Sequence, residues 1–251
     1  MDLGLKGKKA LVTGSTKGIG RAIAEVLLDE GASVAICARN TDEVTAAVAE
    51  MSKKGKVVGA SVDVGNAEAL RAWVASSAEQ LGGIDIYVHN TSAMPARKLD
   101  GWINNFNVDL MALVHGTEAA TAHLAAANGT LISIGTISNV EHFATGSGSY
   151  SALKAAMTNW TLGQAQVLGA QGIRCNVVSP GPIFFENGAW DMIKTHMAPF
   201  FEATLKTHPG GQMGDPLDVA NAVAFLASNK AKHINGANVT VDGGFLKRVD
   251  Y

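Results

Sequence analysis

The stretch that decides the fold is Lys9-Ala-Leu-Val-Thr-Gly-Ser-Thr-Lys-Gly-Ile-Gly20. Its first five residues have the short apolar pattern of a strand, and the residues that follow Gly20 have the pattern of a helix. Gly14, Gly18 and Gly20 let the backbone turn tightly, which brings the N–H groups of the helix N-terminus against a pyrophosphate. Glycines are also common punctuation between a strand and a helix. The cofactor-binding residues predicted here are Gly14, Ser15, Thr16, Lys17, Gly18, Ile19 and Gly20.

The rest of the chain repeats this strand–helix unit. Short runs rich in Val, Ile and Ala alternate with longer helical patterns, as expected when helices cover both faces of a parallel sheet. The sequence therefore predicts a single α/β domain over residues 1–251, a doubly wound (Rossmann) fold with a mostly seven-stranded parallel sheet. The expected strands are 9–13, 33–38, 56–62, 84–89, 130–135, 173–179 and 238–241, and the expected helices are 19–29, 42–53, 67–80, 99–126 and 149–169.

The composition of the chain argues against nucleic acid and membranes as partners. The formal net charge is −2, which provides no basic surface for nucleic acid. Apolar runs such as 222–227 are far shorter than the roughly 18 residues of a membrane span, and the chain enters a strand too early for a signal peptide. Cys37 and Cys175 lie in apolar stretches, as buried thiols of a reducing compartment do. These features predict a cytoplasmic protein with no membrane or nucleic-acid partner.

The end of the second expected strand bears on the choice between NAD and NADP. A carboxylate there binds the free ribose 2′-hydroxyl, whereas an arginine accommodates a 2′-phosphate. This chain has Ala38 where an acid would stand, followed by Arg39 and Asn40, and Lys17 adds a second cation. The alternative is that both cations are ordinary surface charges. We predict NADP as cofactor, NADPH in preference to NADH, with contacts from Arg39 and Asn40.

The third expected strand is followed by Asp63 and Val64. We expect this pair to meet the adenine of the cofactor. The alternative is that Asp63 caps the helix that begins near residue 67.

Tyr150-Ser-Ala-Leu-Lys154 opens the long helical pattern of 149–169. Residues four apart share one face of a helix, so the phenol and the ammonium point into one site. A nearby cation favours the phenolate and draws the tyrosine pKa down from its usual value of about 10. The phenol can then give or take the proton of an alcohol while nicotinamide carries hydride. We predict both as catalytic residues that also contact the cofactor.

The segment 182–214 breaks the strand–helix rhythm. It carries aromatic and methionine side chains and follows the sixth strand, at the sheet edge where ligands bind. It is either a helical hairpin that buries its own aromatic rings or a mobile substrate lid with an apolar lining. We favour the lid, over a small-molecule apolar carbonyl or alcohol, with lining from Phe184, Phe185, Trp190 and Met197.

Together these motifs resemble those of the short-chain dehydrogenase/reductase family, in the short single-domain form similar to 3-oxoacyl-thioester reductases. The resemblance covers essentially the whole chain and includes Pro180-Gly-Pro182, the run 214–228 and Asn238-Val-Thr-Val-Asp-Gly-Gly244. It implies interconversion of a ketone and a secondary alcohol, and cofactor contacts from Pro180, Gly181 and Ile183. It also implies a homo-oligomer, a tetramer or dimer, packed through the helices at 110–126 and 149–168.

Two departures from the family pattern concern hydroxyl groups. The family's serine on the fifth strand, which hydrogen-bonds the substrate carbonyl, aligns best with Thr136, and Ser138 is the alternative. Either could instead bond the local backbone. The family's Asn-Asn-Ala-Gly is here His89-Asn-Thr-Ser92, which keeps Asn90 as a cofactor contact. Ser92 thus replaces a glycine near the expected nicotinamide site, and His89 is expected to pack rather than to catalyse.

A third departure is Asp109, where the resemblance implies an asparagine of the catalytic group. If the family uses the backbone carbonyl at this position, aspartate can substitute for it. A carboxylate that points inward would favour protonated Lys154 and oppose ionisation of Tyr150.

Rival functions remain open at this point. The departures at 92, 109 and 136 fit a catalytically weak NADP-binding sensor or scaffold, whereas the retained Tyr150 and Lys154 favour an enzyme. Among substrates, 3-oxoacyl thioesters are the default analogy, and ring-bearing ketones fit the aromatic residues of the lid equally well. No metal is predicted, because three histidine-containing groups lack compact ligand spacing and are expected at the surface or in loops: Glu141/His142, His115/His123 and His196/His208.

Overall fold

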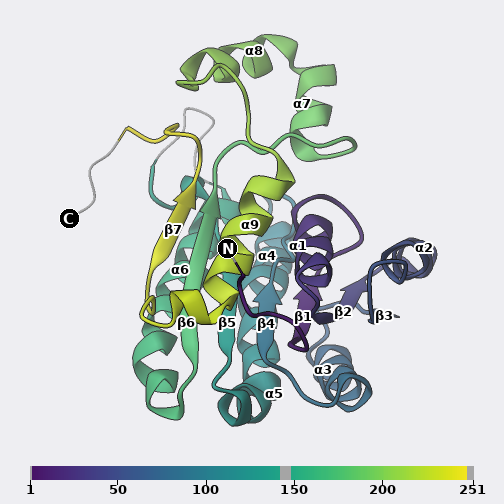
Figure 1. Ribbon diagram of the computed structural model, residues 1–251. Helices are drawn as coiled ribbons and strands as arrows, with labels where there is room; N and C mark the ends of the chain where they lie inside the picture. The colour runs from purple at the N-terminus through teal and green to yellow at the C-terminus, as the bar shows by residue number, and fades with distance from the viewer. Residues whose placement is uncertain (1, 142–147, 248–251) are drawn as a thin grey trace.

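All seven strands of the sheet are parallel and lie in the order β3-β2-β1-β4-β5-β6-β7 (Figure 1). The computed structural model describes residues 2–141 and 148–247. The order reverses between β1 and β4, and the crevice at such a switch point is where doubly wound sheets bind ligands. The strands are β1 Lys9–Thr13, β2 Ser33–Ala38, β3 Val57–Ser61, β4 Ile86–His89, β5 Thr130–Ile134, β6 Arg174–Pro180 and β7 Asn238–Val241.

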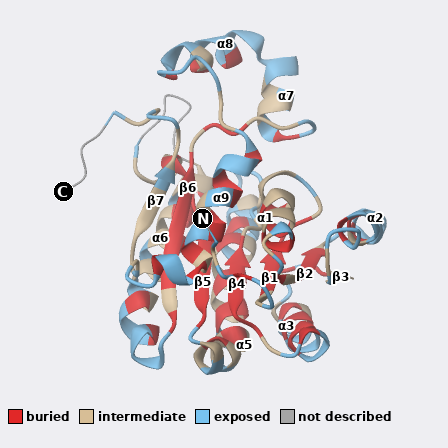
Figure 2. Cartoon of the chain, in the orientation of Figure 1, coloured by how far each residue is buried: buried red, intermediate tan, exposed pale blue. Residues whose placement is uncertain are grey.

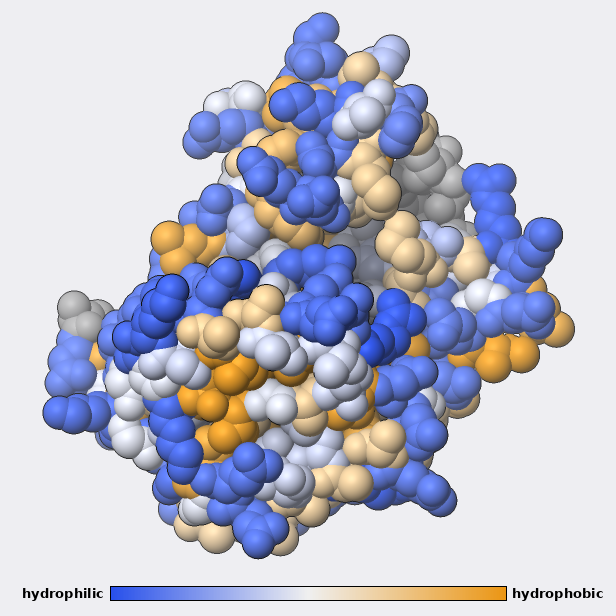
Figure 3. All heavy atoms as spheres, turned by 90° about the vertical axis from the view of Figure 1, so that its right-hand side faces the viewer, coloured by the Kyte–Doolittle hydropathy of each residue, from blue (hydrophilic) through white to orange (hydrophobic). Residues whose placement is uncertain are grey.

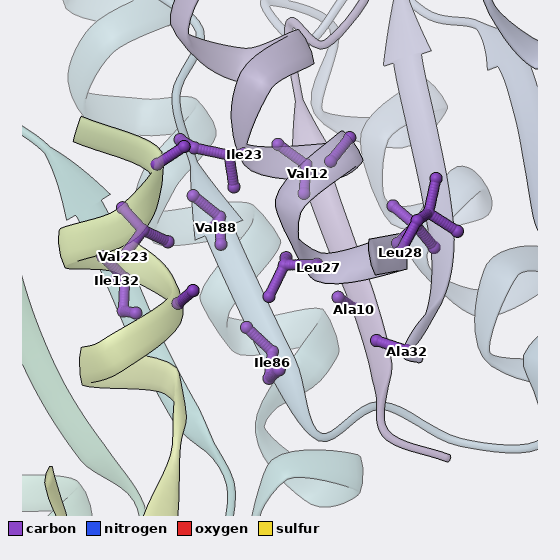
Figure 4. Close-up of a cluster of buried hydrophobic side chains, with 14 of the residues drawn as sticks. Ala10, Val12, Ile23, Leu27, Leu28, Ala32, Ile86, Val88, Ile132 and Val223 are labelled. Carbon is purple, nitrogen blue, oxygen red and sulfur yellow. The ribbon is translucent and has the colours of Figure 1, made fainter. Parts of the chain in front are cut away.

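Successive strand residues point to opposite faces and supply two cores. On one face, Val12 and Val88 pack with Leu27 of α1 and Val223 of α9 (Figure 4). On the other face, Tyr87 and its neighbours pack under α3, α5 and α6. The strands are therefore buried along nearly their whole length in the centre of the sheet (Figure 2). Such burial on both faces explains their continuous apolar sequence.

The helices are divided between the two faces. Helices α1, α2 and α9 supply apolar side chains to the first core, and α3, α5 and α6 supply the second. Helix α9 begins with a capping box in which the side chains of Asp215 and Asp218 bond the backbone at residues 215–218. The bounds are α1 Gly18–Asp29, α2 Thr41–Met51, α3 Ala67–Leu81, α4 Leu99–Asn105, α5 Ala112–Ala127, α6 Ser149–Leu168 and α9 Pro216–Ala227.

The predicted helix over 99–126 is wrong in one respect. It is interrupted by a π-helical turn, Phe106–Met111, which separates α4 from α5. A π turn holds one residue more than the α-helical turn it replaces, so apolar periodicity does not reveal it. The strands predicted at 9–13, 33–38 and 238–241 are confirmed at both ends, and the others differ by one or two residues.

The segment 182–214 forms two helices, α7 Ala189–His196 and α8 Ala198–Thr207, above the carboxyl edge of the sheet (Figure 1). Its two ends meet, because Ile183 pairs with Gly214 in an isolated bridge, and Phe184 N–H donates to the Gly214 carbonyl at 2.9 Å. Figure 3 shows this helical pair standing above the body of the molecule with a hollow beneath it.

No helix in the described part of the chain combines the length and the apolar character that crossing a membrane requires.

Candidate active site

The glycine turn leaves no space for side chains on its inner side. A Cβ at Gly20 would lie 2.3 Å from the Gly14 carbonyl oxygen and 2.4 Å from Asn90 Nδ2, and Gly14 and Gly18 have φ of +63° and +56°. Helix α1 starts at Gly18, and among the described residues no side chain caps its N-terminus. The turn thus offers free N–H groups beside a surface without Cβ atoms, which fits a diphosphate.

Neighbouring polar groups hold this turn in shape. The Asn90 side chain donates to the carbonyl groups of Thr13 and Gly14 at 3.0 and 2.9 Å, and the Ser15 hydroxyl donates to the Val12 carbonyl at 2.7 Å. The Phe185 ring, from the start of the lid, lies against Gly18, where its Cζ is 2.5 Å from the position of an added Cβ. Ser15 and Asn90 therefore shape the turn through bonds to the backbone.

The glycine turn and the residues that follow β2 carry exposed charges of both signs. Arg39 and Lys17 are exposed. The Thr16 hydroxyl donates to the carboxylate of Glu43 at 3.1 Å, which places an acid beside the glycine turn. The Asn40 side chain caps α2 by accepting from the N–H groups at 42 and 43.

Asp63 does not cap the third helix. Asn66 is the N-cap of α3, and its side chain accepts from Ala69 N–H at 3.0 Å. The Asp63 carboxylate is exposed and accepts from Gly65 N–H at 3.0 Å, whereas Val64 is buried in the core. The alternative assignment of Asp63 as a helix cap is therefore wrong.

The sixth strand leads into the lid. Pro180 pairs with Val241 of β7, and a Cβ at Gly181 would lie 2.7 Å from Asp242 Cβ. Ile183 is buried against the α9 side of the sheet. These three residues shape the base of the segment 182–214 at the carboxyl edge of the sheet.

Tyr150 and Lys154 lie one turn apart at the start of α6, as their spacing predicts. The Lys154 ammonium is 2 % exposed, donates to the Ile134 carbonyl at 2.8 Å and lies 6.0 Å from the centre of the Tyr150 ring. Thr136 follows β5, and its side chain opposes the rise of the Tyr150 pKa. Its Oγ1 also accepts from Ser138 N–H at 3.2 Å. Ser138 follows Thr136 in a turn of 3-10 helix.

The expected fall of the tyrosine pKa is wrong for this structure. Burial raises the pKa of Tyr150, the Thr136 side chain lowers it, and the negative charge of Asp109 raises it further. Burial also lowers the pKa of Lys154, while Asp109 opposes that change. The Asp109 carboxylate, fully buried and 3.5 Å from Lys154 Nζ, therefore points inward.

The loop after β4 contacts the same carboxylate. The hydroxyl of Ser92 donates to Asp109 Oδ1 at 2.5 Å, and Asn105 donates to Oδ2 at 2.9 Å. His89 is fully buried, and burial together with the charge of Lys154 lowers its pKa to about 3. Its imidazole is therefore neutral, in keeping with a packing residue.

The aromatic side chains of the lid pack mostly on one another. Trp190 stacks on Phe200 with ring centres 5.9 Å apart, and Phe184 meets Phe201 edge-on at 6.1 Å. The ammonium of Lys194 lies 5.3 Å from the Phe184 ring centre. Met197 is 50 % exposed. The segment is therefore a helical hairpin that packs its own aromatic rings, and its role as a substrate lid stays a prediction.

His208 lies in the loop after α8, one of the two kinds of position expected for it. Its side chain is buried, and its ring centre lies 5.0 Å from that of Phe245. His142 lies outside the described residues. Among the described residues, no three side chains of His, Cys, Asp or Glu form a group that could hold a metal ion.

The doubly wound sheet, with a glycine turn and with buried Lys154 one helical turn from Tyr150 at its carboxyl edge, defines a nucleotide-binding oxidoreductase class. A family model described as Enoyl-(Acyl carrier protein) reductase matches residues 14–246. The chain belongs to the short-chain dehydrogenase/reductase family.

Individual relatives match over nearly their whole length. Isoepoxydon dehydrogenase patN of Aspergillus clavatus is 36% identical over 247 residues, which cover 96% of this chain and 95% of the relative. The 3-oxoacyl-(acyl-carrier-protein) reductase FabG of Vibrio harveyi is 34% identical over 249 residues, 96% of this chain and 98% of the relative. The crystal structure of L-sorbose reductase from Gluconobacter frateurii, complexed with NADPH and L-sorbose, has a TM-score of 0.91 and 28% identity, covering 99% of this chain and 100% of that one.

Sequence reasoning missed several residues of this site. Asn105 and Ser149 link the end of α4 to the start of α6, since Ser149 Oγ lies 2.6 Å from Asn105 Oδ1. Glu43 lies beside the glycine turn, and Lys194 lies over the rings of the lid. Contacts between elements far apart in sequence leave no local pattern, although a helix spacing of four between Asn105 and Asp109 was a usable signal.

Proposed function

We propose that this protein is an NADP-dependent oxidoreductase that interconverts a ketone and a secondary alcohol, with Tyr150 as general acid and base. The observation that carries the proposal is the buried ammonium of Lys154, which lies 6.0 Å from the ring centre of Tyr150 at the start of α6. Thr136, whose side chain lowers the pKa of the phenol, is proposed as a second hydroxyl donor to the carbonyl oxygen. A bound nicotinamide supplies or takes the hydride.

Each side chain has a distinct role in this proposal. Tyr150 gives its proton to the carbonyl oxygen during reduction and takes it back during oxidation. Thr136 polarises the carbonyl by a second hydrogen bond, and Ser138 is the alternative donor. Lys154 supplies a fixed positive charge below the phenol. The raised pKa of Tyr150 keeps it a phenol at neutral pH, the form that donates in reduction.

The cofactor proposal begins from the glycine turn. The turn 14–20 would bind the diphosphate, and Arg39 with Lys17 would bind a 2′-phosphate. Glu43 opposes this through its negative charge beside Thr16. Further contacts are proposed for Asn40, Asp63, Val64 and Ile183.

Cofactor preference can be tested by measuring the dissociation constants of NADPH and NADH. We expect Arg39→Asp to shift the ratio of the two constants by roughly tenfold towards NADH, as loss of a charge-assisted bond of about 1.5 kcal/mol implies. Lys206→Asp, in the lid helix α8, is the matched control. An unchanged ratio in Arg39→Asp contradicts a role of this residue in cofactor choice.

The substrate proposal is a small or medium apolar ketone, including 3-oxoacyl thioesters and ring-bearing ketones. Its support is the apolar side chains of the segment 182–214 and, for 3-oxoacyl thioesters, the name of the Vibrio harveyi relative. A homo-oligomer is proposed on the exposed apolar side chains that follow one another along α4 and the π-helical turn: Leu99, Trp102, Ile103 and Phe106.

The decisive experiment adds apolar ketones to the NADPH-loaded protein and follows the nicotinamide absorbance. We expect Tyr150→Phe to lower turnover by roughly a thousandfold, the scale of general acid catalysis, with NADPH binding unchanged. Turnover retained in this variant contradicts the role of Tyr150. Tight NADPH binding without turnover of any ketone would favour the sensor or scaffold, which the departures at 92 and 109 support.

A further inference from the structure

Two residues that depart from the family pattern touch each other. Ser92 lies in the loop after β4, and Asp109 lies in the π-helical turn. Their side chains are joined by the 2.5 Å hydrogen bond from Ser92 Oγ to Asp109 Oδ1, across 17 residues of sequence. The two substitutions thus form one contact.

Four donors converge on the buried Asp109 carboxylate. They are the Ser92 hydroxyl, the Ala93 N–H at 3.3 Å, the Asn105 amide at 2.9 Å and the Lys154 ammonium at 3.5 Å. A carboxylate only accepts, whereas an asparagine would turn an amide donor toward this set. A buried charge is stable only when it is paired and hydrogen-bonded, and both oxygens of Asp109 meet that condition.

The same network reaches the start of helix α6. Asn105 Oδ1 lies 2.6 Å from the hydroxyl of Ser149, the residue before Tyr150. Ser149 Oγ also accepts from Ala96 N–H at 3.0 Å, in the loop that carries Ser92. The carboxylate therefore links this loop, the π-helical turn and α6.

We propose that Ser92, Asn105 and Asp109 act as one positioning unit for Lys154, and that this chain depends on a carboxylate where the family pattern has an asparagine. This inference rests on the proposed function. Ser92 and Asn105 hold the carboxylate, and the carboxylate offsets the charge of Lys154, whose ammonium also donates to the Ile134 carbonyl. Asp109 acts through Lys154 and is a positioning residue.

The consequence is a dependence of reduction on pH. Reduction needs Tyr150 as phenol and Lys154 as ammonium, and both lose their protons as the pH rises. Asp109 raises the pKa of each group. From β4, the titratable group that faces Tyr150 and Lys154 is His89. Its pKa is lowered to about 3, so it is neutral and adds no charge at the alkaline pH of this change. Removing the carboxylate lowers both pKa values, so the alkaline fall in activity moves to lower pH.

The test uses Asp109→Asn, with Asp100→Asn on the neighbouring helix α4 as matched control. The rate of ketone reduction per enzyme, as kcat/KM, is measured against pH. We expect the alkaline limb to move down by roughly one pH unit in Asp109→Asn, the scale of a close charge, and to stay in place in the control. A limb that stays in place in an active Asp109→Asn variant overturns the proposal.

A second measurement needs neither cofactor nor substrate. The tyrosinate absorbance of the ligand-free protein is titrated, and the Tyr150 contribution is assigned by subtracting the curve of Tyr150→Phe. Its midpoint is expected to fall in Asp109→Asn, and an unchanged midpoint overturns the proposal even if the protein reduces no ketone. Should Asp109→Asn not fold, Ser92→Gly combined with Asp109→Asn restores the family residues at both positions and carries the same expectation.

The proposed role of Ser92, as a hydrogen-bond donor to the Asp109 carboxylate, can be tested separately. Ser92→Ala is expected to lower the midpoint of denaturant unfolding, because the buried carboxylate loses a donor. Ser76→Ala is the matched control, since Ser76 is an exposed serine whose oxygen accepts from Gln80. Equal unfolding midpoints in the two variants would remove Ser92 from the unit.

Discussion

The glycine turn and the lid lie at the same edge of the sheet but are built in opposite ways. In the turn, backbone atoms approach to distances that exclude a Cβ at Gly20, and the side chains of Ser15 and Asn90 are bonded to backbone carbonyls. In the lid, the rings pack on each other and Met197 is half exposed. The glycine turn is therefore sterically fixed, whereas the segment 182–214 leaves apolar surface exposed.

The largest expected effect comes from filling the turn. Gly20→Ala places a methyl group against the Gly14 carbonyl and Asn90, where overpacking costs about 1–3 kcal/mol. We expect NADPH affinity, measured by fluorescence titration, to fall by roughly tenfold or more. Gly163→Ala in α6 is the control, since its added methyl meets nothing within 4 Å and removes a helix-destabilising glycine. If Gly20→Ala binds NADPH like the unchanged protein, the turn is not the rigid element described above.

A smaller effect is expected in the lid. Trp190→Ala removes the ring that stacks on Phe200, and loss of one aromatic contact corresponds to about 1 kcal/mol. We expect the KM for an apolar ketone to rise by roughly fivefold, with the affinity for NADPH unchanged. Phe225→Ala on the exposed side of α9 is the control. An equal loss of NADPH affinity would show that the lid and the turn are not separable in this way.

The contrast between the glycine turn and the segment 182–214 also explains which parts of the structure the sequence could predict. A turn without room for side chains requires glycines at fixed positions, so Gly14, Gly18 and Gly20 identify it in the sequence. The helix spacing of Tyr150 and Lys154 likewise follows from their separation by four residues. These local constraints were sufficient for the doubly wound sheet and for the placement of this pair.

The polar network around Asp109 could not be predicted from the sequence, because its contacts are not local. Its contacts join residues far apart in sequence, such as Ser92 with Asp109 and Asn105 with Ser149. The direction of the Tyr150 pKa was mistaken because burial outweighs the favourable contacts, and burial depends on the whole packing around the phenol. The stacking of Trp190 on Phe200 depends in the same way on how two short helices meet.

The π-helical turn at Phe106–Met111 makes this region sensitive to chain length. Each residue of a helix advances the side chains by about 100° around its axis. Loss of one residue here would restore a regular α-helix and rotate Asn105 relative to Asp109, so that they no longer share one network. Over evolutionary time, this stretch should therefore accept exchanges of side chains more readily than insertions or deletions, and a relative of different length here should lack the paired serine and carboxylate.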